Sequence, residues 1–289
     1  MAPPAASAEP LRLSPEHGIL TIDLEHWHSV SCVPVMRYLL GVLRELGATA
    51  TFFVVGCRAE AIAEVLREAR ADGHEIASHG WIHKPPAAFT LAEFREELKR
   101  SQDVLSGIAG AEVIGYRSPL FGVVAETMWA LDVLVELGFR YDSSVFPFAG
   151  GRYGIAGFPA GPSRVQREAG SIIELPPSTV AVAGRKWPVA GGGYFRLLPY
   201  PIIRAAVKAV QRDGRPFVAY CHPYEFDPRT LHYSEVDGLG WLKARSDEMK
   251  TNLWRRGMAD KVTRLLKEFT FTSVERCLAG GRLGEGQAA

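Results

Sequence analysis

Short apolar segments alternate with amphipathic segments through the first half of the chain. Five short apolar segments favour strands, and they span residues 18–23, 48–55, 74–78, 113–116 and 139–142. Four longer segments carry apolar side chains at helical spacing, over residues 34–46, 59–72, 91–106 and 127–137. Thr90 and Glu93 form a capping-box pattern at the start of the third helix. The alternation therefore predicts repeated strand–helix units.

Repeated strand–helix units imply a parallel sheet covered by helices. A further strand is expected at residues 216–221. Polar, potentially reactive side chains stand at or just after the ends of the expected strands: Asp23, Glu25, His79, Arg117, Asp142 and His222. In an α/β barrel the carboxyl ends of the strands form the active-site face. No GxGxxG turn follows the first strand, so a (β/α) barrel is expected rather than an open doubly wound sheet.

The second half of the chain is less regular. Residues 143–200 are rich in glycine and proline, which predicts loops and short strands around one rim. Helices are expected at residues 201–212 and about 247–268. The last ten residues are expected to be frayed, and residues 1–15 are expected to form a flexible arm.

Composition narrows the class of protein. The 289 residues carry 33 Lys+Arg against 32 Asp+Glu. The net charge of +1 offers no basic surplus for binding nucleic acid. Hydrophobic residues make up 47% of the chain, which is typical of a globular domain rather than a disordered one. No segment reaches the roughly 18 apolar residues of a membrane span.

The cellular compartment is inferred from the first residues and the cysteines. Residues 1–10 lack the positive start and the apolar core of a signal peptide. The four cysteines are scattered without a CxxC pair, which is typical of reduced thiols. We therefore expect a cytoplasmic protein.

Two histidines, His79 and His83, stand at positions i and i+4 and can converge on one metal ion if the segment forms a helical turn. Asp23 and Glu25 lie on one face of an extended segment, because side chains alternate along a strand. Two histidines and one carboxylate are the ligands of an open catalytic metal site, and the second carboxylate is then free to act as a base. This alternation favours Glu25 as the third ligand, and His26 is its rival.

Five motifs in this order resemble the polysaccharide deacetylase family, which is carbohydrate esterase family four and carries the NodB-type domain. They are Thr-x-Asp at 21–23, Ser-His-x-x-x-His at 78–83, Arg-Ser-Pro at 117–119, Tyr-Asp-Ser-Ser at 141–144 and Cys-His-Pro at 221–223. Further segments are similar to the branch associated with bacterial exopolysaccharide and exosortase loci, at 174–179, 188–196 and 222–228. The resemblance covers about residues 18–270. It implies one catalytic domain over residues 16–289 on a distorted (β/α) barrel, with a C-terminal, partly helical extension over about 185–270.

The resemblance also implies roles for individual residues. Asp23 matches the catalytic base, and Arg117 matches the arginine that keeps this base ionised and oriented. Asp142 and His222 match the pair that supplies the general acid. The backbone N–H of Leu120 matches the donor to the oxyanion.

His79 and His83 match the metal-binding histidines of the family. Many members place the ligand aspartate directly after the base, where this chain has Leu24, and Glu25 is expected to take that role here. Zinc is the default ion for nitrogen and oxygen ligands, and Co²⁺ or Ni²⁺ could also serve.

The implied reaction is metal-dependent hydrolysis of the acetamide of an N-acetylated amino sugar, in a polysaccharide, an oligosaccharide or a sugar precursor, with release of acetate. Trp81, between the metal histidines, either stacks on a sugar or packs inside the protein. Tyr194 and Phe195 are expected as aromatic walls beside Gly191–Gly193, although that glycine segment could also serve only the backbone.

Three alternatives stay open. The first is a metal-dependent amide hydrolase that acts on a non-polymeric natural product. The second is a non-haem iron oxygenase, because two histidines and a carboxylate also form the facial triad of those enzymes. The third is an inactive carbohydrate binder.

Overall fold

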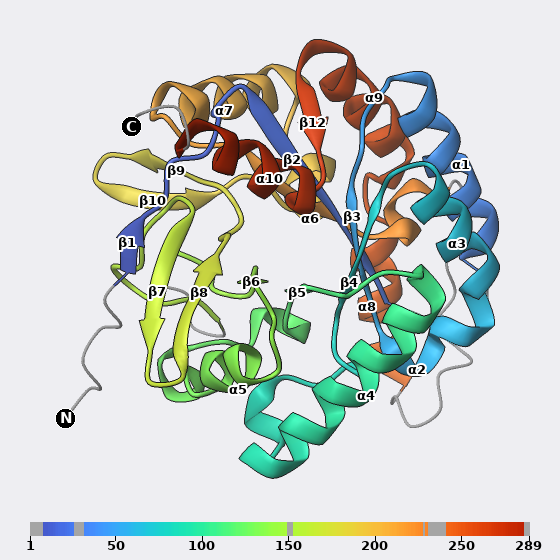
Figure 1. The fold of residues 1–289 in the computed structure, drawn as a ribbon. Helices are drawn as coiled ribbons and strands as arrows, with labels where there is room; N and C mark the ends of the chain where they lie inside the picture. The colour runs from blue at the N-terminus through green and yellow to red at the C-terminus, as the bar shows by residue number, and fades with distance from the viewer. Residues whose placement is uncertain (1–7, 26–31, 149–152, 228, 231–240, 286–289) are drawn as a thin grey trace.

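The computed structural model describes residues 8–25, 32–148, 153–227, 229–230 and 241–285 of the chain. At its centre is a curved sheet with helices outside it (Figure 1). The parallel strands that carry the site lie side by side in this order: β11 (Val218–Cys221), β2 (His17–Leu24), β3 (Thr51–Val54), β4 (Glu75–Ser78), β5 (Gly115–Tyr116) and β6 (Tyr141–Asp142). Five of these strands fall within segments that the sequence predicts as strands, and β2 extends one residue beyond each end of the predicted 18–23.

Further strands extend this sheet beyond β6. They are the parallel β8 (Gly170–Glu174), then β7 (Ser163–Arg167), antiparallel to β8, and β1 (Ala8–Pro10), antiparallel to β7. The short β12 (Thr270–Thr272) lies off this order and pairs in parallel with the start of β2.

Irregular chain closes the sheet beside β11. The Ser178 N–H donates to the Val218 carbonyl at 3.0 Å, and the Tyr220 N–H donates to the Ala190 carbonyl at 2.8 Å. The chain that follows β8 therefore continues the hydrogen bonding on the free edge of β11. The fold is a distorted (β/α) barrel, as the sequence predicted.

Helices cover the outside of the barrel (Figure 1). In the first half these are α1 (Val33–Glu45), α2 (Gly56–Ala59), α3 (Ala63–Ala71), α4 (Leu91–Ala109) and α5 (Ala130–Glu136). In the second half they are α6 (Gly192–Leu197), α7 (Tyr200–Arg212), α8 (Trp241–Asn252) and α9 (Met258–Glu268). The last helix, α10 (Val274–Glu285), lies across the amino-terminal end of the barrel, where Val274 and Leu278 join a core cluster with Ile19 and Phe53. The predicted capping box of α4 forms, because the Thr90 N–H donates to Glu93 Oε2 at 2.7 Å and the Glu93 N–H donates to Thr90 Oγ1 at 3.3 Å.

Several predicted boundaries differ from the structure. The single helix expected over residues 59–72 is divided into α2, a 3₁₀ turn at Glu60–Ile62 and α3. The helix expected over about 247–268 is two helices, α8 and α9, because Trp254 has a left-handed φ of 54° and ends the first one. The last residues were expected to be frayed, but α10 extends to Glu285.

The arm expected over residues 1–15 is partly structured. Within it, β1 pairs with β7, and the Leu13 side chain is buried. Apolar contacts at Leu11 and Leu13 supply the reason, because both side chains pack against a small core cluster at this end of the sheet.

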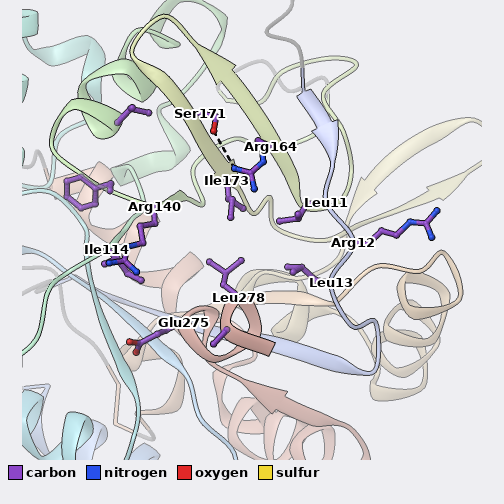
Figure 2. Close-up of a pocket in the computed structure, with 13 residues that line it drawn as sticks. Leu11, Arg12, Leu13, Ile114, Arg140, Arg164, Ser171, Ile173, Glu275 and Leu278 are labelled. Carbon is purple, nitrogen blue, oxygen red and sulfur yellow. Dashed lines mark hydrogen bonds between the residues drawn. The ribbon is translucent and has the colours of Figure 1, made fainter. Parts of the chain in front are cut away.

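A cavity of about 520 Å³ lies at the amino-terminal ends of β5 and β6, on the opposite end of the barrel from the residues that follow the strands. Figure 2 shows the apolar side chains of Leu11, Leu13, Ile173 and Leu278 around it. The short hairpin of β9 (Thr179–Val182) and β10 (Arg185–Pro188) forms a separate sheet. Within the described ranges, no helix combines the length and the hydropathy that crossing a bilayer requires.

Candidate active site

The polar residues singled out in the sequence lie along one end of the barrel. Asp23 is the penultimate residue of β2 and Asp142 is the last residue of β6, while His79, Arg117 and His222 directly follow β4, β5 and β11. These strands are parallel neighbours, so their carboxyl ends meet at one rim.

Arg117 is fully buried and occupies the centre of this rim. Its Nη1 donates to Asp23 Oδ1 and to Thr21 Oγ1, both at 2.7 Å. Its Nε and Nη2 donate to the carbonyl and the hydroxyl of Ser143 at 3.0 and 2.7 Å. The guanidinium also lies over the ring of Phe53, 4.3 Å from its centroid. A buried charge with this many partners is held in one orientation, and Arg117 holds Asp23 with it.

Glu25, His79 and His83 converge next to this pair. Glu25 Oε1 lies 3.2 Å from His79 Nε2 and 2.8 Å from His83 Nε2. One ligand atom from each residue lies within 4.8 Å of the others. The convergence does not come from the helical turn that the i, i+4 spacing suggested, because residues 79–83 form bends rather than a helix.

The bends are held by two side chains of α4 that the sequence analysis missed. Glu97 Oε1 accepts hydrogen bonds from the backbone N–H groups of Trp81 and Ile82 at 2.6 and 2.9 Å. Ser101 Oγ donates to the carbonyl of Gly80 at 3.1 Å, and Gly80 has a left-handed φ of 77°. Burial raises the pKa of Glu97 to about 7. In the sequence, the i, i+4 spacing that places Glu97 and Ser101 on one helix face is the feature that could have revealed this pair.

The three converging side chains fit a divalent cation. His79 Nδ1 donates to the Arg117 carbonyl at 2.7 Å, which leaves the lone pair of Nε2 available to a cation held between His79 and Glu25. Burial would raise the pKa of Glu25, but the neighbouring histidines His222, His79 and His83 lower it well below its usual value. An ionised carboxylate and two neutral imidazoles are a suitable ligand set for Zn²⁺. His26, the rival ligand, lies outside the described residues.

His222 faces the same place from the other side of the rim. Its Nε2 lies 3.7 Å from Glu25 Oε1, and its Nδ1 lies 3.5 Å from Glu225 Oε2. The Tyr224 ring stacks on the imidazole at 5.1 Å. Burial would lower the pKa of His222, but Tyr224, Glu25 and Glu225 together raise it well above its usual value.

The expected pairing of His222 with Asp142 is therefore wrong. Asp142 is fully buried, accepts a hydrogen bond from the Ser144 hydroxyl and is joined to the carboxyl group of Glu174. Burial raises the pKa of Glu174 well above its usual value, and the charge of Asp142 raises it further, which favours a proton bound between the two carboxyl groups. The carboxylate beside His222 is that of Glu225. Both Glu174 and Glu225 lie in segments that are similar to the exopolysaccharide-associated branch, at 174–179 and 222–228.

The loop after β5 carries the residue matched to the oxyanion donor. Leu120 and Phe121 both have left-handed φ values, 59° and 52°. Side chains other than glycine avoid this region, and each such residue costs on the order of 1 kcal/mol. Leu120 is 42% exposed, so this residue lies at the surface.

The three aromatic residues expected to bind sugar have different surroundings. Phe195 is buried and stacks on Phe217 at 6.4 Å, so it belongs to the core and not to a substrate wall. The Trp81 ring is covered by the guanidinium of Arg100 at 4.0 Å, which is the packing role rather than sugar stacking. Tyr194 is half-buried and hydrogen-bonds with Tyr153, and burial raises its pKa. Of the three, Tyr194 remains available at the rim.

Two family models match adjacent parts of this chain. A polysaccharide deacetylase model matches residues 16–141, and a domain of unknown function, DUF3473, matches residues 143–279. The peptidoglycan deacetylase of Helicobacter pylori is 28% identical over 107 residues, which are 37% of this chain and 36% of that protein. A chitin deacetylase of Pestalotiopsis sp is 32% identical over 105 residues, which are 35% of this chain and 34% of that protein. The match thus spans only a minor part of either relative.

Solved structures show the same fold. A structure from Mycobacterium smegmatis, assigned as a polysaccharide deacetylase, aligns with 98% of this chain and 95% of its own at a TM-score of 0.62 and 20% identity. A CE4 family pseudoenzyme from Bacillus anthracis aligns with 96% of this chain and 70% of its own at a TM-score of 0.53 and 12% identity. Residues 16–141 therefore carry a polysaccharide deacetylase domain, and residues 143–279 match the DUF3473 family.

Proposed function

We propose that this protein is a metal-dependent N-deacetylase that hydrolyses the acetamide of an N-acetylated amino sugar and releases acetate. One observation carries the proposal: the buried Asp23–Arg117 pair lies beside the converging Glu25, His79 and His83, and His222 faces them. Both matched segments contribute, because His222 comes from the second one. This supports one catalytic domain over residues 16–289 rather than two independent ones.

Glu25, His79 and His83 would hold the ion, and Zn²⁺ suits two imidazoles and a carboxylate. When bound, such an ion polarises the amide carbonyl and lowers the pKa of a water to about 7. The tautomer of His79 is set in advance by the Arg117 carbonyl. Arg117 thus contacts the base through its side chain and a proposed ligand through its backbone.

Asp23 would accept the proton of the attacking water. Its carboxylate is held by Arg117 at 2.7 Å and is almost fully buried, so no bulk water competes for it. The Leu120 N–H would donate to the oxygen of the tetrahedral intermediate, where an added donor is most effective.

His222 would supply the proton that the leaving nitrogen needs. When the C–N bond breaks, the electron pair moves to nitrogen, and an unprotonated amide nitrogen is a very poor leaving group. Tyr224, Glu25 and Glu225 raise the pKa of His222, which favours the protonated form that this role requires. The products are acetate and the free amino sugar.

The relatives indicate the class of substrate. These relatives are named for peptidoglycan and chitin, and both polymers contain N-acetylated amino sugars. Of the alternatives, an amide of a smaller natural product uses the same chemistry. The pseudoenzyme among the neighbours shows that this fold also occurs without the activity, so the proposal depends on the side chains rather than on the fold.

Acetate release tests the proposal. The purified protein, loaded with Zn²⁺, Co²⁺ or Ni²⁺ in turn, is incubated with N-acetylglucosamine tetramer with and without oxygen. The proposal predicts acetate and free amine in equal amounts, independent of oxygen and abolished by a chelator. Oxygen-dependent turnover would indicate the oxygenase, and binding of the tetramer with no acetate from any metal form would indicate an inactive carbohydrate binder.

A further inference from the structure

The strongest feature outside the assigned roles is the seat of Glu225 behind His222. Glu225 is on the short 3₁₀ helix Pro223–Phe226 and is 1% exposed. Its Oε2 accepts the backbone N–H of His222 at 2.9 Å and lies 3.5 Å from the Nδ1 of the same residue. One carboxylate oxygen thus contacts both the backbone and the ring of His222.

Two features of α6 fix this carboxylate. Arg196 Nε lies 3.3 Å from Glu225 Oε1. Gly192 leaves the space that the carboxylate fills, because a Cβ at that position would lie 1.6 Å from Glu225 Oε2. Its neighbour Gly193 has no such constraint, since a Cβ there would meet only Arg196, at 3.9 Å. The glycine segment thus makes room for a buried carboxylate, which a purely backbone turn would not explain.

The titratable groups that face the imidazole come from each element packed around it. They are Glu25 after β2, Tyr220 on β11, and Tyr224 and Glu225 on the 3₁₀ helix. Glu25 lies on the Nε2 side, where the ion would be held, and the two tyrosines contact the ring through their own rings. Among the described residues, Glu225 is the carboxylate on the Nδ1 side.

We propose that Glu225 is the positioning residue of the general acid: it holds the proton on Nδ1 of His222 and directs Nε2 toward the leaving nitrogen, while Gly192 and Arg196 hold Glu225. This inference rests on the proposed function. It replaces the aspartate–histidine pair expected across two strands by a pair within one short segment of the DUF3473 domain. Glu225 touches no substrate atom in this role.

Leaving-group dependence tests this role in the metal-loaded enzyme. Glu225→Gln and Gly192→Ala are compared with the matched control Gly193→Ala on two acetyl donors, N-acetylglucosamine tetramer and 4-nitrophenyl acetate. The amine needs protonation to leave and 4-nitrophenolate does not. Loss of general acid help typically costs about 10²-fold or more, so both test variants should lose about 10- to 100-fold in kcat on the amide, less than about 3-fold on the ester, and Gly193→Ala neither. Equal losses on both donors, or no loss on the amide, would overturn the proposal.

A measurement without substrate separates this inference from the proposed function. In ¹⁵N-histidine NMR of the holoenzyme, with His222 assigned through His222→Gln, the Nδ1 signal should move in Glu225→Gln and Gly192→Ala but not in Gly193→Ala. An unmoved Nδ1 signal in Glu225→Gln would refute the contact even in an active enzyme. A wild-type protein that releases no acetate, but shows these shifts, would refute the proposed function and leave the contact standing.

Discussion

Two buried aspartates at the same rim have opposite neighbours. Asp23, near the end of β2, lies beside the guanidinium of Arg117, while Asp142, at the end of β6, lies beside the carboxyl of Glu174. A positive neighbour stabilises a carboxylate, and a second carboxyl group makes the pair retain a proton. The comparison shows that burial near a strand end does not by itself make an aspartate a base. The charge of the neighbouring side chain determines whether the carboxyl group is ionised.

The same contrast separates the two matched segments. Residues 16–141 supply the proposed base, its arginine and the three proposed metal ligands. Residues 143–279 supply proton-holding groups, namely Glu174 and the His222–Glu225 pair. The second segment also buttresses the first, because both Ser143 groups accept from Arg117.

The largest effect is expected at Asp23. Asp23→Asn keeps the shape but removes the proton acceptor, so kcat on N-acetylglucosamine tetramer should fall by about 10³-fold, within the range for acid–base groups. Metal content, measured by atomic emission, should stay unchanged. Asp142→Asn is the matched variant on the other strand. It should lower kcat by less than 10-fold, because Asp142 is not the proposed proton acceptor. The reverse order of these losses would break the comparison.

The next effect concerns the bends that carry His79 and His83. Glu97→Ala frees two backbone N–H groups of that segment. Residues behind metal ligands typically contribute 10- to 100-fold in affinity, so the Zn²⁺ dissociation constant from chelator competition should rise by about that factor. Glu97→Gln keeps an acceptor oxygen and should recover most of it. An unchanged Zn²⁺ affinity in Glu97→Ala would show that the positions of His79 and His83 do not depend on Glu97.

A smaller effect follows from the proton on Glu174. Its folded pKa lies well above its usual value, so the folded state binds a proton that the unfolded state has released above about pH 4.5. The stability from this group is complete below that pH and is lost as pH rises toward the folded pKa, by up to about 1.4 kcal/mol per pH unit. Glu174→Gln should therefore lose less stability than wild type between pH 5.5 and 7.5 in urea titrations.

The control for that experiment is Glu112→Gln, since Glu112 pairs with Arg140 at the surface. Its stability should follow the wild-type pH dependence. If Glu174→Gln also follows it, the Asp142–Glu174 pair does not hold the proton, and the contrast between the two aspartates disappears.

The smallest effect is expected at the aromatic rim. If Tyr194 contacts the sugar, Tyr194→Ala should raise KM by about 3- to 10-fold at constant kcat, as expected for an aromatic contact of about 1 kcal/mol. Trp81→Ala should instead lower thermal stability and leave KM unchanged, because Arg100 covers its ring. A rise in KM confined to Trp81→Ala would reverse the assignment of these two residues.

Much of the barrel was predictable because its signals are local. Apolar spacing located the strands and helices of the first half, and the alternation along β2 placed Asp23 and Glu25 at one site. The pairing of His79 and His83 was predicted from a helical turn, but the two residues are brought together by bends that Glu97 holds. The contact between Asp142 and Glu174 could not be predicted from local patterns, because the sheet order brings β8 beside β6 across a long irregular segment.

The most direct test of the account is anomalous diffraction from a crystal of the Zn²⁺-loaded protein, at the zinc absorption edge. The account predicts one strong peak coordinated by Glu25 Oε1, His79 Nε2 and His83 Nε2, with the Asp23 carboxylate facing it and making no bond to it. A peak coordinated by other residues, or a peak bound directly to Asp23 with Glu25 turned away, would contradict it.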